Sequence, residues 1–337
     1  MRRRDAVGGL LAITAVTVPL RAKAQAPKHE NPFRIATLPD RQAPSNAWFS
    51  DTMRDLGWME GRDFILVQSG LFGTSINEQQ LGEAIKQVLA DKPDLILTGG
   101  TAYALIAHRA VPATPIVMVN SGYPVEAGLA ESLARPGKNV TGNTIYAGVE
   151  VWGKLLQLLR DAQPSLRRVS VLWAYVPPAF PREEVEPCYA ELRNAARLLG
   201  LQLQIVEVAN PDRLSAALVE IEAEKPDALL LAGAPTVQVL ASEAQFAVNN
   251  RLPSIVDYPW PVGLIKPYPV LAYGPALREL VRSAAGSVDK IMRGANPSDL
   301  PIQLPARFEL ILNLQTAKMI GLTISPDLRL RADEVIE

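Results

Sequence analysis

From residue 32 onward, short apolar segments alternate with longer segments in which apolar residues recur at helical spacing. The short segments are rich in β-branched residues and predict strands at 34–38, 64–67, 94–97 and 116–119. The longer segments predict helices at 45–57, 77–90 and 102–109. Such an alternation favours a parallel sheet covered by helices on both faces. The sequence therefore predicts an α/β fold.

The same pattern recurs in the second half of the chain. The clearest repeat is segment 92–100, KPDLILTGG, which corresponds to 225–233, KPDALLLAG, 133 positions later. Three further pairs occur in the same order, namely Arg34 with Arg168, Leu56-Gly57 with Leu199-Gly200, and Pro115 with Pro253. Four landmarks in one order predict two similar lobes, each built on a doubly wound parallel sheet.

After residue 270 the rhythm changes, with strand-like segments at 270–274 and 308–312 and helices at 275–293 and 314–320. These elements can complete both lobes, so we expect the chain to cross between the lobes more than once. The expected division is 32–143 plus 270–301 for the N-terminal lobe and 144–269 plus 302–330 for the C-terminal lobe. Several crossing strands make a hinge, and a cleft lies between hinged lobes.

The N-terminal residues 1–24 have the features of a secretory signal peptide. Three arginines at positions 2–4 precede an uncharged apolar stretch at 6–20, and small residues follow around Ala24. Fifteen apolar residues fall short of the roughly 20 that a membrane-spanning helix needs. We therefore expect cleavage after Ala24, export by the Sec or twin-arginine route, and a periplasmic protein with 29 basic and 34 acidic residues.

Composition excludes several function classes. Cys188 is the single cysteine, and His29 and His108 are the only histidines, so neither a disulfide framework nor a cysteine- or histidine-rich metal site is expected. The near-zero net charge gives no reason to expect nucleic acid as a partner. The chain also lacks the Gly-rich dinucleotide and phosphate loops and the Gly-x-Ser-x-Gly elbow. We expect no cofactor, no metal, no catalytic residue and no enzymatic activity.

Ligands of doubly wound sheets bind beyond the carboxyl ends of the strands, near helix N-termini. In the first lobe this rule selects Asp40, Gly100, Thr101, Asn120 and Ser121. In the second lobe it selects Gly233, Ala234, Thr236 and Asp257. Thr101 and Thr236 occupy equivalent positions, where a hydroxyl can either bond a ligand or cap its own helix.

Aromatic residues gather at the same predicted strand ends: Tyr123, Trp173, Tyr175, Tyr258 and Trp260. Tyr273, on the strand-like segment at 270–274, is a further candidate. Aromatic rings can stack on a planar ligand or pack into the rim of a cleft. We expect Tyr123, Trp173 and Tyr175 to point toward the cleft, and we expect neither Tyr123 nor Tyr175 to be needed to fill a lobe core.

Segment 132–142, SLARPGKNVTG, resembles the S-L-A-R-P-G-G-N-V-T-G signature of a family of ABC transporter substrate-binding proteins. The same family is matched by the C-terminal segments at 289–291, 299–301, 308–310, 313–318 and 331–337. The resemblance implies a type I periplasmic-binding-protein fold, with two Rossmann-like lobes joined by a three-stranded hinge. It also implies a monomeric receptor that delivers a small-molecule solute to the membrane permease of a cognate ABC importer. Some members bind aromatic amino acids.

The chain departs from the family pattern where a ligand is expected. Tyr123-Pro124 replaces Asp-Pro, Trp173-Ala174-Tyr175 replaces an Asn-Pro segment, and 261–267 replaces a Glu-Ala-Gly-Gly-Leu segment. These substitutions favour an aromatic or otherwise planar organic solute, with carboxylates among the candidates. An alternative is a receptor that feeds a membrane sensor. A periplasmic enzyme lacks credible catalytic groups, and a transcription regulator would need a helix-turn-helix and no signal peptide.

Overall fold

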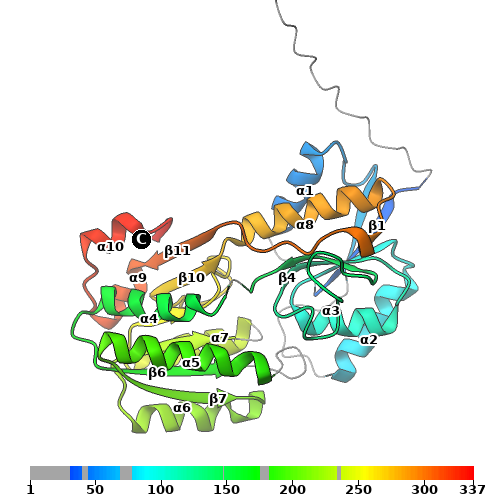
Figure 1. The fold of residues 1–337 in the computed structure, drawn as a ribbon. Coiled ribbons are helices and arrows are strands. Elements are labelled where there is room, and N and C mark those ends of the chain that lie inside the picture. The colour runs from blue at the N-terminus through cyan, green and yellow to red at the C-terminus, as the bar shows by residue number, and fades with distance from the viewer. Residues whose placement is uncertain (1–30, 40–44, 69–77, 147, 175–181, 234–236) are drawn as a thin grey trace, which may run out of the picture.

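The computed structural model describes residues 31–39, 45–68, 78–146, 148–174, 182–233 and 237–337, and the predicted signal peptide lies outside them. The chain forms two α/β lobes, each built on its own sheet (Figure 1). The predicted fold class is therefore confirmed. Within the described residues, no helix combines the length and apolar character that crossing a bilayer requires.

The first sheet has five parallel strands in the order β2-β1-β3-β4-β5. Its strands are β1 (Phe33–Leu38), β2 (Phe64–Gln68), β3 (Leu95–Thr98), β4 (Ile116–Ser121) and β5 (Val140–Thr144). Three helices of the same part of the chain are α1 (Ser45–Asp55), α2 (Glu78–Ala90) and α3 (Thr101–Ala110). Strands β3 and β4 are buried along nearly their whole length, as expected for a sheet covered on both faces.

The second sheet has the order β12-β11-β10-β9-β8-β6-β7 and is parallel except for the β10–β11 pair. Its strands are β6 (Arg168–Ala174), β7 (Gln202–Val208), β8 (Ala228–Ala232), β9 (Ser254–Val256), β10 (Leu271–Pro275), β11 (Phe308–Asn313) and β12 (Glu334–Ile336). Its helices are α4 (Glu150–Ala162), α5 (Arg182–Leu199), α6 (Leu214–Ala223), α7 (Val237–Asn249), α9 (Leu314–Ile320) and α10 (Pro326–Arg331). A 3-10 turn, η1 (Pro211–Arg213), precedes α6.

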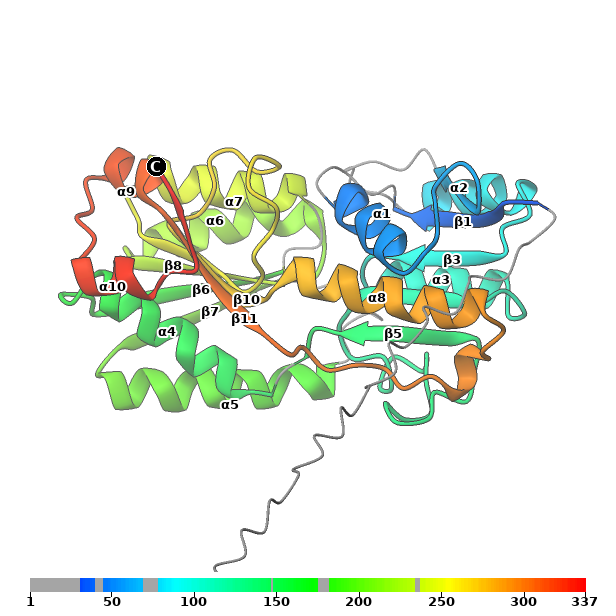
Figure 2. The same cartoon turned by 90° about the horizontal axis from the view of Figure 1, so that it is seen from above.

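The long helix α8 (Leu277–Met292) comes late in the sequence but packs on the first lobe, beside α1 (Figure 2). Val281, Ala284 and Val288 on its apolar face share one buried cluster with Ile35 and Leu97 of the first sheet. The first lobe therefore includes a helix that follows most strands of the second lobe in the sequence.

The chain passes between the lobes three times. It leaves the first sheet after β5, returns from β10 into α8, and leaves again after Gln303 to enter β11. A single bridge pairs Gln303 with Asn143, so the last passage begins alongside the first. The turn η2 (Pro297–Asp299) links α8 to this return segment. The three passages form the multi-strand hinge that the family resemblance implies.

Sheet membership corrects one predicted boundary. The expected division placed 270–301 with the N-terminal lobe, but β10 is hydrogen-bonded between β9 and β11 in the second sheet. The elements after it, α8 and η2, do pack against the first lobe. A lone apolar strand carries no local signal of which sheet it will join, because membership depends on long-range pairing.

The internal repeat has a structural counterpart. Lys92 and Lys225 both adopt a positive φ, at 49° and 48°, just before β3 and β8. The carboxylate of Asp94 accepts a hydrogen bond from the backbone N–H of Arg34 at 2.7 Å. The carboxylate of Asp227 accepts one from the backbone N–H of Arg168 at 2.8 Å. In each lobe, the Lys-Pro-Asp segment therefore joins the first strand to a neighbouring strand of the same sheet, which is β3 beside β1 and β8 beside β6.

Candidate functional site

The site predicted at the strand ends of the first lobe is held together by Thr101. Its hydroxyl oxygen accepts hydrogen bonds from the Ser121 hydroxyl at 3.0 Å and from the Gly122 N–H at 2.7 Å. Thr101 is the first residue of α3, and the residue before it, Gly100, is the N-cap and supplies no side-chain hydrogen bond. Thr101 therefore joins the end of β4 to the start of α3, which neither expected role for its hydroxyl had included.

Asn120 links the same strand end to the second lobe. Its Oδ1 accepts a hydrogen bond from the Gly100 N–H at 3.1 Å. Its Nδ2 donates to the hydroxyl of Tyr258, which follows β9, at 3.4 Å. Gly100 has a φ of 89°, a conformation that side-chain-bearing residues rarely adopt, so glycine is required at this turn.

Tyr123 also reaches across to the second lobe. Its hydroxyl lies 3.5 Å from the Sγ of Cys188 on α5, and its ring lies 4.7 Å from that of Tyr146, which follows β5. Tyr123 is only 5% exposed. The ring therefore fills space between the lobes beside the hinge, so Tyr123 has a packing role at the lobe boundary.

Trp173 lies inside the second lobe. It is fully buried, with its ring 4.4 Å from that of Trp152 on α4 and 5.1 Å from that of Tyr189 on α5. Successive strand residues alternate between the two faces of a sheet, so Trp173 shares a face with Val169 and Val171. Helices α4 and α5 cover that face. The expectation that Trp173 points into the cleft is wrong.

Two predicted site residues of the second lobe lie within the described residues: Gly233 directly follows β8, and Asp257 directly follows β9. The N–H of Gly233 donates to Oδ2 of Asp257 at 3.0 Å. The Asp257 side chain keeps a fraction of its surface exposed, but burial raises its pKa to about 6, because the carboxylate loses hydration. The hydrogen bond from Gly233 acts in the opposite direction and only partly offsets burial.

The next residue, Tyr258, packs away from its own lobe. It is 7% exposed and belongs to the buried cluster of the first lobe, where Trp260 packs against the same cluster. The rings of Tyr258 and Trp260 meet edge to face at 5.6 Å. The loop after β9 therefore inserts aromatic side chains from the second lobe into the first.

The remaining candidates fall elsewhere. Tyr273 lies on β10, with its ring 5.7 Å from that of Phe308 on the neighbouring hinge strand. Asp40, Tyr175, Ala234 and Thr236 lie outside the described residues. Within the described residues, hydrogen bonds and chain neighbours bring together five predicted site residues, namely Gly100, Thr101, Asn120, Ser121 and Tyr258. Asp257 precedes Tyr258 in the chain, and Gly233 is hydrogen-bonded to Asp257.

Glu243 is a residue that the strand-end rule missed. It is fully buried on α7, and neither of its carboxyl oxygens has a hydrogen-bond partner within the described structure. Burial and the neighbouring Asp257 carboxylate together raise its pKa well above the usual range. A signal was present, because Glu243 occupies the apolar helical stripe formed by Leu240, Ala244 and Ala247.

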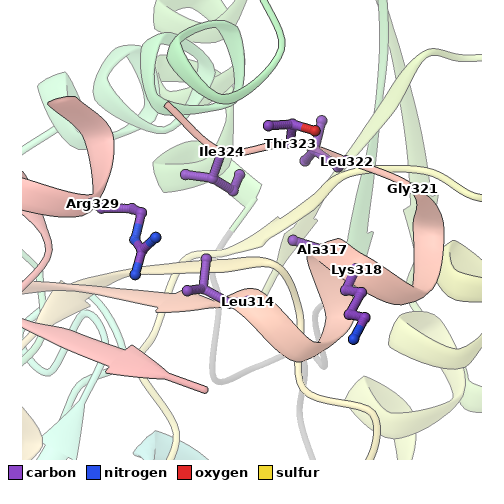
Figure 3. Close-up of a pocket in the computed structure, with 8 residues that line it drawn as sticks. All are labelled: Leu314, Ala317, Lys318, Gly321, Leu322, Thr323, Ile324 and Arg329. Carbon is purple, nitrogen blue, oxygen red and sulfur yellow. The ribbon is translucent and has the colours of Figure 1, made fainter. Parts of the chain in front are cut away.

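Two surface pockets lie apart from this strand-end group. One, of about 370 Å³, is formed at α9 and α10 and has Leu314, Leu322 and Ile324 near Lys318 and Arg329 (Figure 3). The other, of about 830 Å³, lies where β6 and β7 begin, at the opposite edge of the second sheet. Neither pocket includes a residue that the sequence predicted for the site. Among the described residues, no group of three or more metal-ligating side chains forms a metal site.

The protein has two α/β lobes joined by three chain passages, and polar residues at the strand ends of one lobe meet those of the other. This is the architecture of a solute receptor. The family model of ABC transporter substrate binding proteins matches residues 49–336, so the chain belongs to that family.

Relatives agree with this assignment. A tyrosine-binding protein of Clostridioides difficile (strain R20291) is 24% identical over 281 residues, which cover 81% of this chain and 75% of the relative. The crystal structure of an ABC domain in complex with L-Trp from Streptococcus pneumonia has a TM-score of 0.73 at 18% identity, covering 91% of this chain and all of the other. The ligand-free, open structure of CD0873, a substrate-binding protein with adhesive properties from Clostridium difficile, has a TM-score of 0.61 at 20% identity and covers 90% of this chain and 98% of the other. At these identities the solved structures show a shared fold.

Proposed function

We propose that the protein is the solute receptor of an ABC importer and captures a small aromatic or otherwise planar organic solute between its lobes. The observation that carries this proposal is the meeting of strand-end residues from both lobes, where Asn120 contacts Tyr258. The relatives support it, because one is a tyrosine-binding protein and one was crystallised with L-Trp.

Capture would follow from the hinge. A solute that first binds the strand ends of one lobe gains contacts with the other lobe only when the two approach. This difference in contacts shifts the population toward the closed form. In the first lobe, the start of α3 offers backbone N–H groups and a favourable helix dipole to a negatively charged or polar group of the solute.

Aromatic recognition would come from the loop after β9. Within the described residues, Tyr258 and Trp260 lie at the lobe boundary, where Trp260 keeps part of its surface exposed and the ring of Tyr258 packs in the first-lobe cluster; Tyr175 remains a candidate outside the described residues. An aromatic pair with a polar tip can stack a planar ring and bond its substituents. Trp173 has no such role, since it is enclosed by its own lobe.

The partner and location follow from the same role. The mature chain would begin at about Gln25, work as a monomer in the periplasm, and present its closed form to the cognate membrane permease. Intact-mass analysis of the protein from a periplasmic fraction tests the export step. A chain that keeps Met1 and stays in the membrane contradicts it.

A thermal-shift screen on the ligand-free mature protein tests the solute class. The panel contains aromatic amino acids, aromatic acids and purines, with sugars as the comparison set. A ligand at a hundred times its Kd stabilises the folded state by about 2.7 kcal/mol. Small-angle scattering on the best ligand should then show a smaller radius of gyration. Stabilisation only by sugars contradicts the proposed solute class, and stabilisation without compaction contradicts closure.

A further inference from the structure

The larger of the two surface pockets is a hollow of about 830 Å³ where β6 and β7 begin. This volume is within the range of roughly 300–1,000 Å³ that is usual for small-molecule sites. The residues that line it include three arginines, Arg160, Arg167 and Arg168, and one acidic residue, Asp227. Three positive charges against one negative charge leave the hollow with an excess of two, although the whole chain has a net charge of −1.

Arg160 is half-buried in the wall of this hollow, and two hydrogen bonds fix the orientation of its guanidinium. Its Nη1 donates to the backbone carbonyls of Leu166 and Leu199, each at 3.1 Å. The Nε–H and the two Nη2 N–H groups donate to no acceptor within the described structure. Nε and Nη2 form the planar edge of the guanidinium that binds two oxygens of one oxyanion side by side. Arg160 therefore presents an oriented and unused pair of donors.

Arg167 and Arg168 add two guanidinium groups that have no carboxylate partner. Both residues are exposed, and within the described part of the chain neither side chain makes a hydrogen bond or an ion pair. The Asp227 carboxylate accepts the backbone N–H groups of both residues, at 3.0 and 2.8 Å, and not their side chains. Asp227 thus fixes the backbone at the start of β6 and leaves both guanidinium groups available to a ligand.

The internal repeat shows that this arrangement is specific to the second lobe. Arg34 occupies in β1 the position that Arg168 occupies in β6, as their matching backbone bonds to the two Lys-Pro-Asp segments show. The Arg34 side chain is paired, because its Nε donates to the Asp91 carbonyl at 2.6 Å and its Nη2 donates to the Asp91 carboxylate at 3.3 Å. Glu224 is the counterpart of Asp91, but within the described residues it makes no ion pair with Arg168. The same position is therefore neutralised in the first lobe and left charged in the second.

We propose that this hollow is a second binding site, which takes the phosphate group of a small molecule and is separate from the solute cleft. A phosphate dianion balances the excess of two charges, and its oxygens accept hydrogen bonds from the Arg160 edge and from the two neighbouring guanidinium groups. A monovalent carboxylate can use the same edge but leaves one positive charge unbalanced. The seven residues of β6 separate the hollow from the strand ends at the cleft by about 20 Å. Binding here therefore does not depend on a solute between the lobes.

An anionic bilayer is another source of phosphate groups, but the hollow fits it less well. Basic patches that hold a protein on anionic lipids contain about four to eight lysines and arginines, and this hollow has three arginines. The net charge of −1 gives the whole chain no general attraction to a negative surface. We therefore assign the site to a free phosphate compound, and the experiment includes lipid vesicles as a separate arm.

The test is a titration of the isotope-labelled, ligand-free mature protein with inorganic phosphate at pH 8 and constant ionic strength. NMR follows the Nε–H signals of the arginines, and loss of one signal in Arg160→Lys assigns that of Arg160. We expect the Arg160 signal to shift and to saturate, because its Nε–H is free to bind an oxygen. The Arg34 signal should stay in place, since its Nε–H already donates to Asp91. Acetate should bind at least about tenfold more weakly than phosphate, because it brings one charge instead of two.

Variants assign the binding to the three arginines. The double variant Arg167→Gln/Arg168→Gln breaks no side-chain contact, so its melting temperature should stay within about 2 °C and its phosphate affinity should fall about tenfold or more. Arg160→Lys keeps the charge but removes the planar edge, and it should weaken phosphate about three- to tenfold. The charge-matched control Arg213→Gln/Arg278→Gln changes two exposed arginines outside the hollow and should alter the affinity less than about twofold. Melting temperatures show that each variant is folded before its affinity is compared.

Three results would overturn the inference. The first is a shift that grows linearly with phosphate and is equalled by sodium chloride, which would show only general ionic screening. The second is an equal phosphate affinity in the Arg167→Gln/Arg168→Gln variant and in the charge-matched control. The third is flotation with phosphatidylglycerol vesicles, lost in the same double variant, without saturable binding of inorganic phosphate. None of these results bears on the solute class tested at the cleft, so the two proposals fail separately.

Discussion

Asn120 and Tyr258 lie 138 positions apart in the sequence, and the amide of Asn120 donates a hydrogen bond to the hydroxyl of Tyr258 at 3.4 Å. Asn120 is the last residue but one of β4 in the first sheet, and Tyr258 follows β9 in the second. The bond therefore spans the two lobes. At 3.4 Å it is longer than the 2.7–3.2 Å of a strong N–H···O bond, so its contribution without ligand is small.

Tyr258→Phe tests this contact. The substitution keeps the ring that packs into the first-lobe cluster and removes only the hydroxyl. We expect the ligand-free melting temperature to change by no more than about 2 °C, because a long hydrogen bond adds little stability. Solute affinity should fall about two- to tenfold if the closed form uses this contact. An unchanged affinity measured by calorimetry would show that the hydroxyl takes no part in closure.

Tyr123 contributes to stability through its ring. Because it is 5% exposed, Tyr123→Ala leaves a cavity between the lobes and should cost about 2–4 kcal/mol of unfolding free energy. Tyr123→Phe removes only the hydroxyl beside Cys188 and should cost less than about 1 kcal/mol. Urea unfolding measures both values. Equal midpoints for the two variants would contradict a packing role for the ring.

Cys188 reports on the same contact. Its thiol is fully buried in the native protein, so reaction with a water-soluble disulfide reagent should be slow. Tyr123→Ala should raise the reaction rate about tenfold or more, since it opens the space in front of the thiol. The wild-type protein unfolded in guanidinium gives the upper limit of the rate. Rapid reaction of the folded wild type would contradict the burial of this thiol.

The sequence predicted the fold well because its signals are local. Strand periodicity, helix periodicity and the repeated Lys-Pro-Asp segments are each read from one continuous stretch of fewer than twenty residues, and the structure has strands and helices at those places. The assignment of β10 was wrong because its apolar pattern is the same for either sheet. Only its pairing with β9 and β11 decides the lobe to which it belongs.

The site was predicted less well, for a physical reason. The strand-end rule gives the edge of the sheet but not the face to which each side chain points. Trp173 shares a face with Val169 and Val171, but both faces of β6 are buried, so only the packing of α4 and α5 shows that the ring lies in the core. Glu243 was missed because it lies two turns inside a helix, where the rule does not apply. Thr101 and Asn120 lie next to strand ends in the structure, but their contacts with Ser121 and Tyr258 depend on tertiary structure and have no local sequence signal.

The acidic pair predicts an unusual pH dependence of stability. Asp257 has a pKa of about 6 in the folded protein against 3.8 in the unfolded chain, so the folded state binds more protons between these values. The free energy of unfolding should therefore fall as the pH rises from about 4 to 6, by on the order of 2–3 kcal/mol from this group. Glu243, whose pKa is also raised, extends the loss to higher pH.

Variants isolate this effect from the other titrating groups. Asp257→Asn and Glu243→Gln should each be more stable than the wild type at pH 8 and should lose part of that advantage at pH 5. The exposed Asp212→Asn should follow the wild-type curve. Urea unfolding at both pH values gives the comparison. A wild-type advantage at pH 8 would mean that the two carboxylates have partners which balance their charge.

The duplicated Lys-Pro-Asp segments predict matched effects in the two lobes. Asp94→Ala removes the acceptor for the Arg34 N–H, and Asp227→Ala removes the acceptor for the N–H groups of Arg167 and Arg168. Each bond joins a charged acceptor to the start of a strand, so each variant should lose about 1–2 kcal/mol. Hydrogen exchange should show the loss in the lobe that carries the change. Loss of protection in both lobes from either variant would contradict their independence.

Helix α8 is fixed to the first lobe by a polar contact as well as by its apolar face. The indole N–H of Trp58 donates to Oδ1 of Asp289 on α8 at 2.8 Å. Arg293 donates to the same carboxylate at 2.8 Å, and its guanidinium lies 5.2 Å from the centre of the Trp58 ring. Trp58 is 1% exposed, so this contact lies at the edge of the first-lobe core.

Asp289→Ala should therefore destabilise the protein by about 1–3 kcal/mol, because it removes the carboxylate to which a buried indole N–H donates. Asp289→Asn retains an oxygen acceptor for Trp58 and should lose less. Asp51→Ala is the matched control, because it breaks an ion pair with Arg54 whose side chains are 61% and 65% exposed, and it should cost less than about 0.5 kcal/mol. Urea unfolding followed by tryptophan fluorescence measures all three. Equal stability of Asp289→Ala and Asp51→Ala would show that apolar packing alone fixes α8, and that the shared carboxylate adds nothing to the completion of the first lobe.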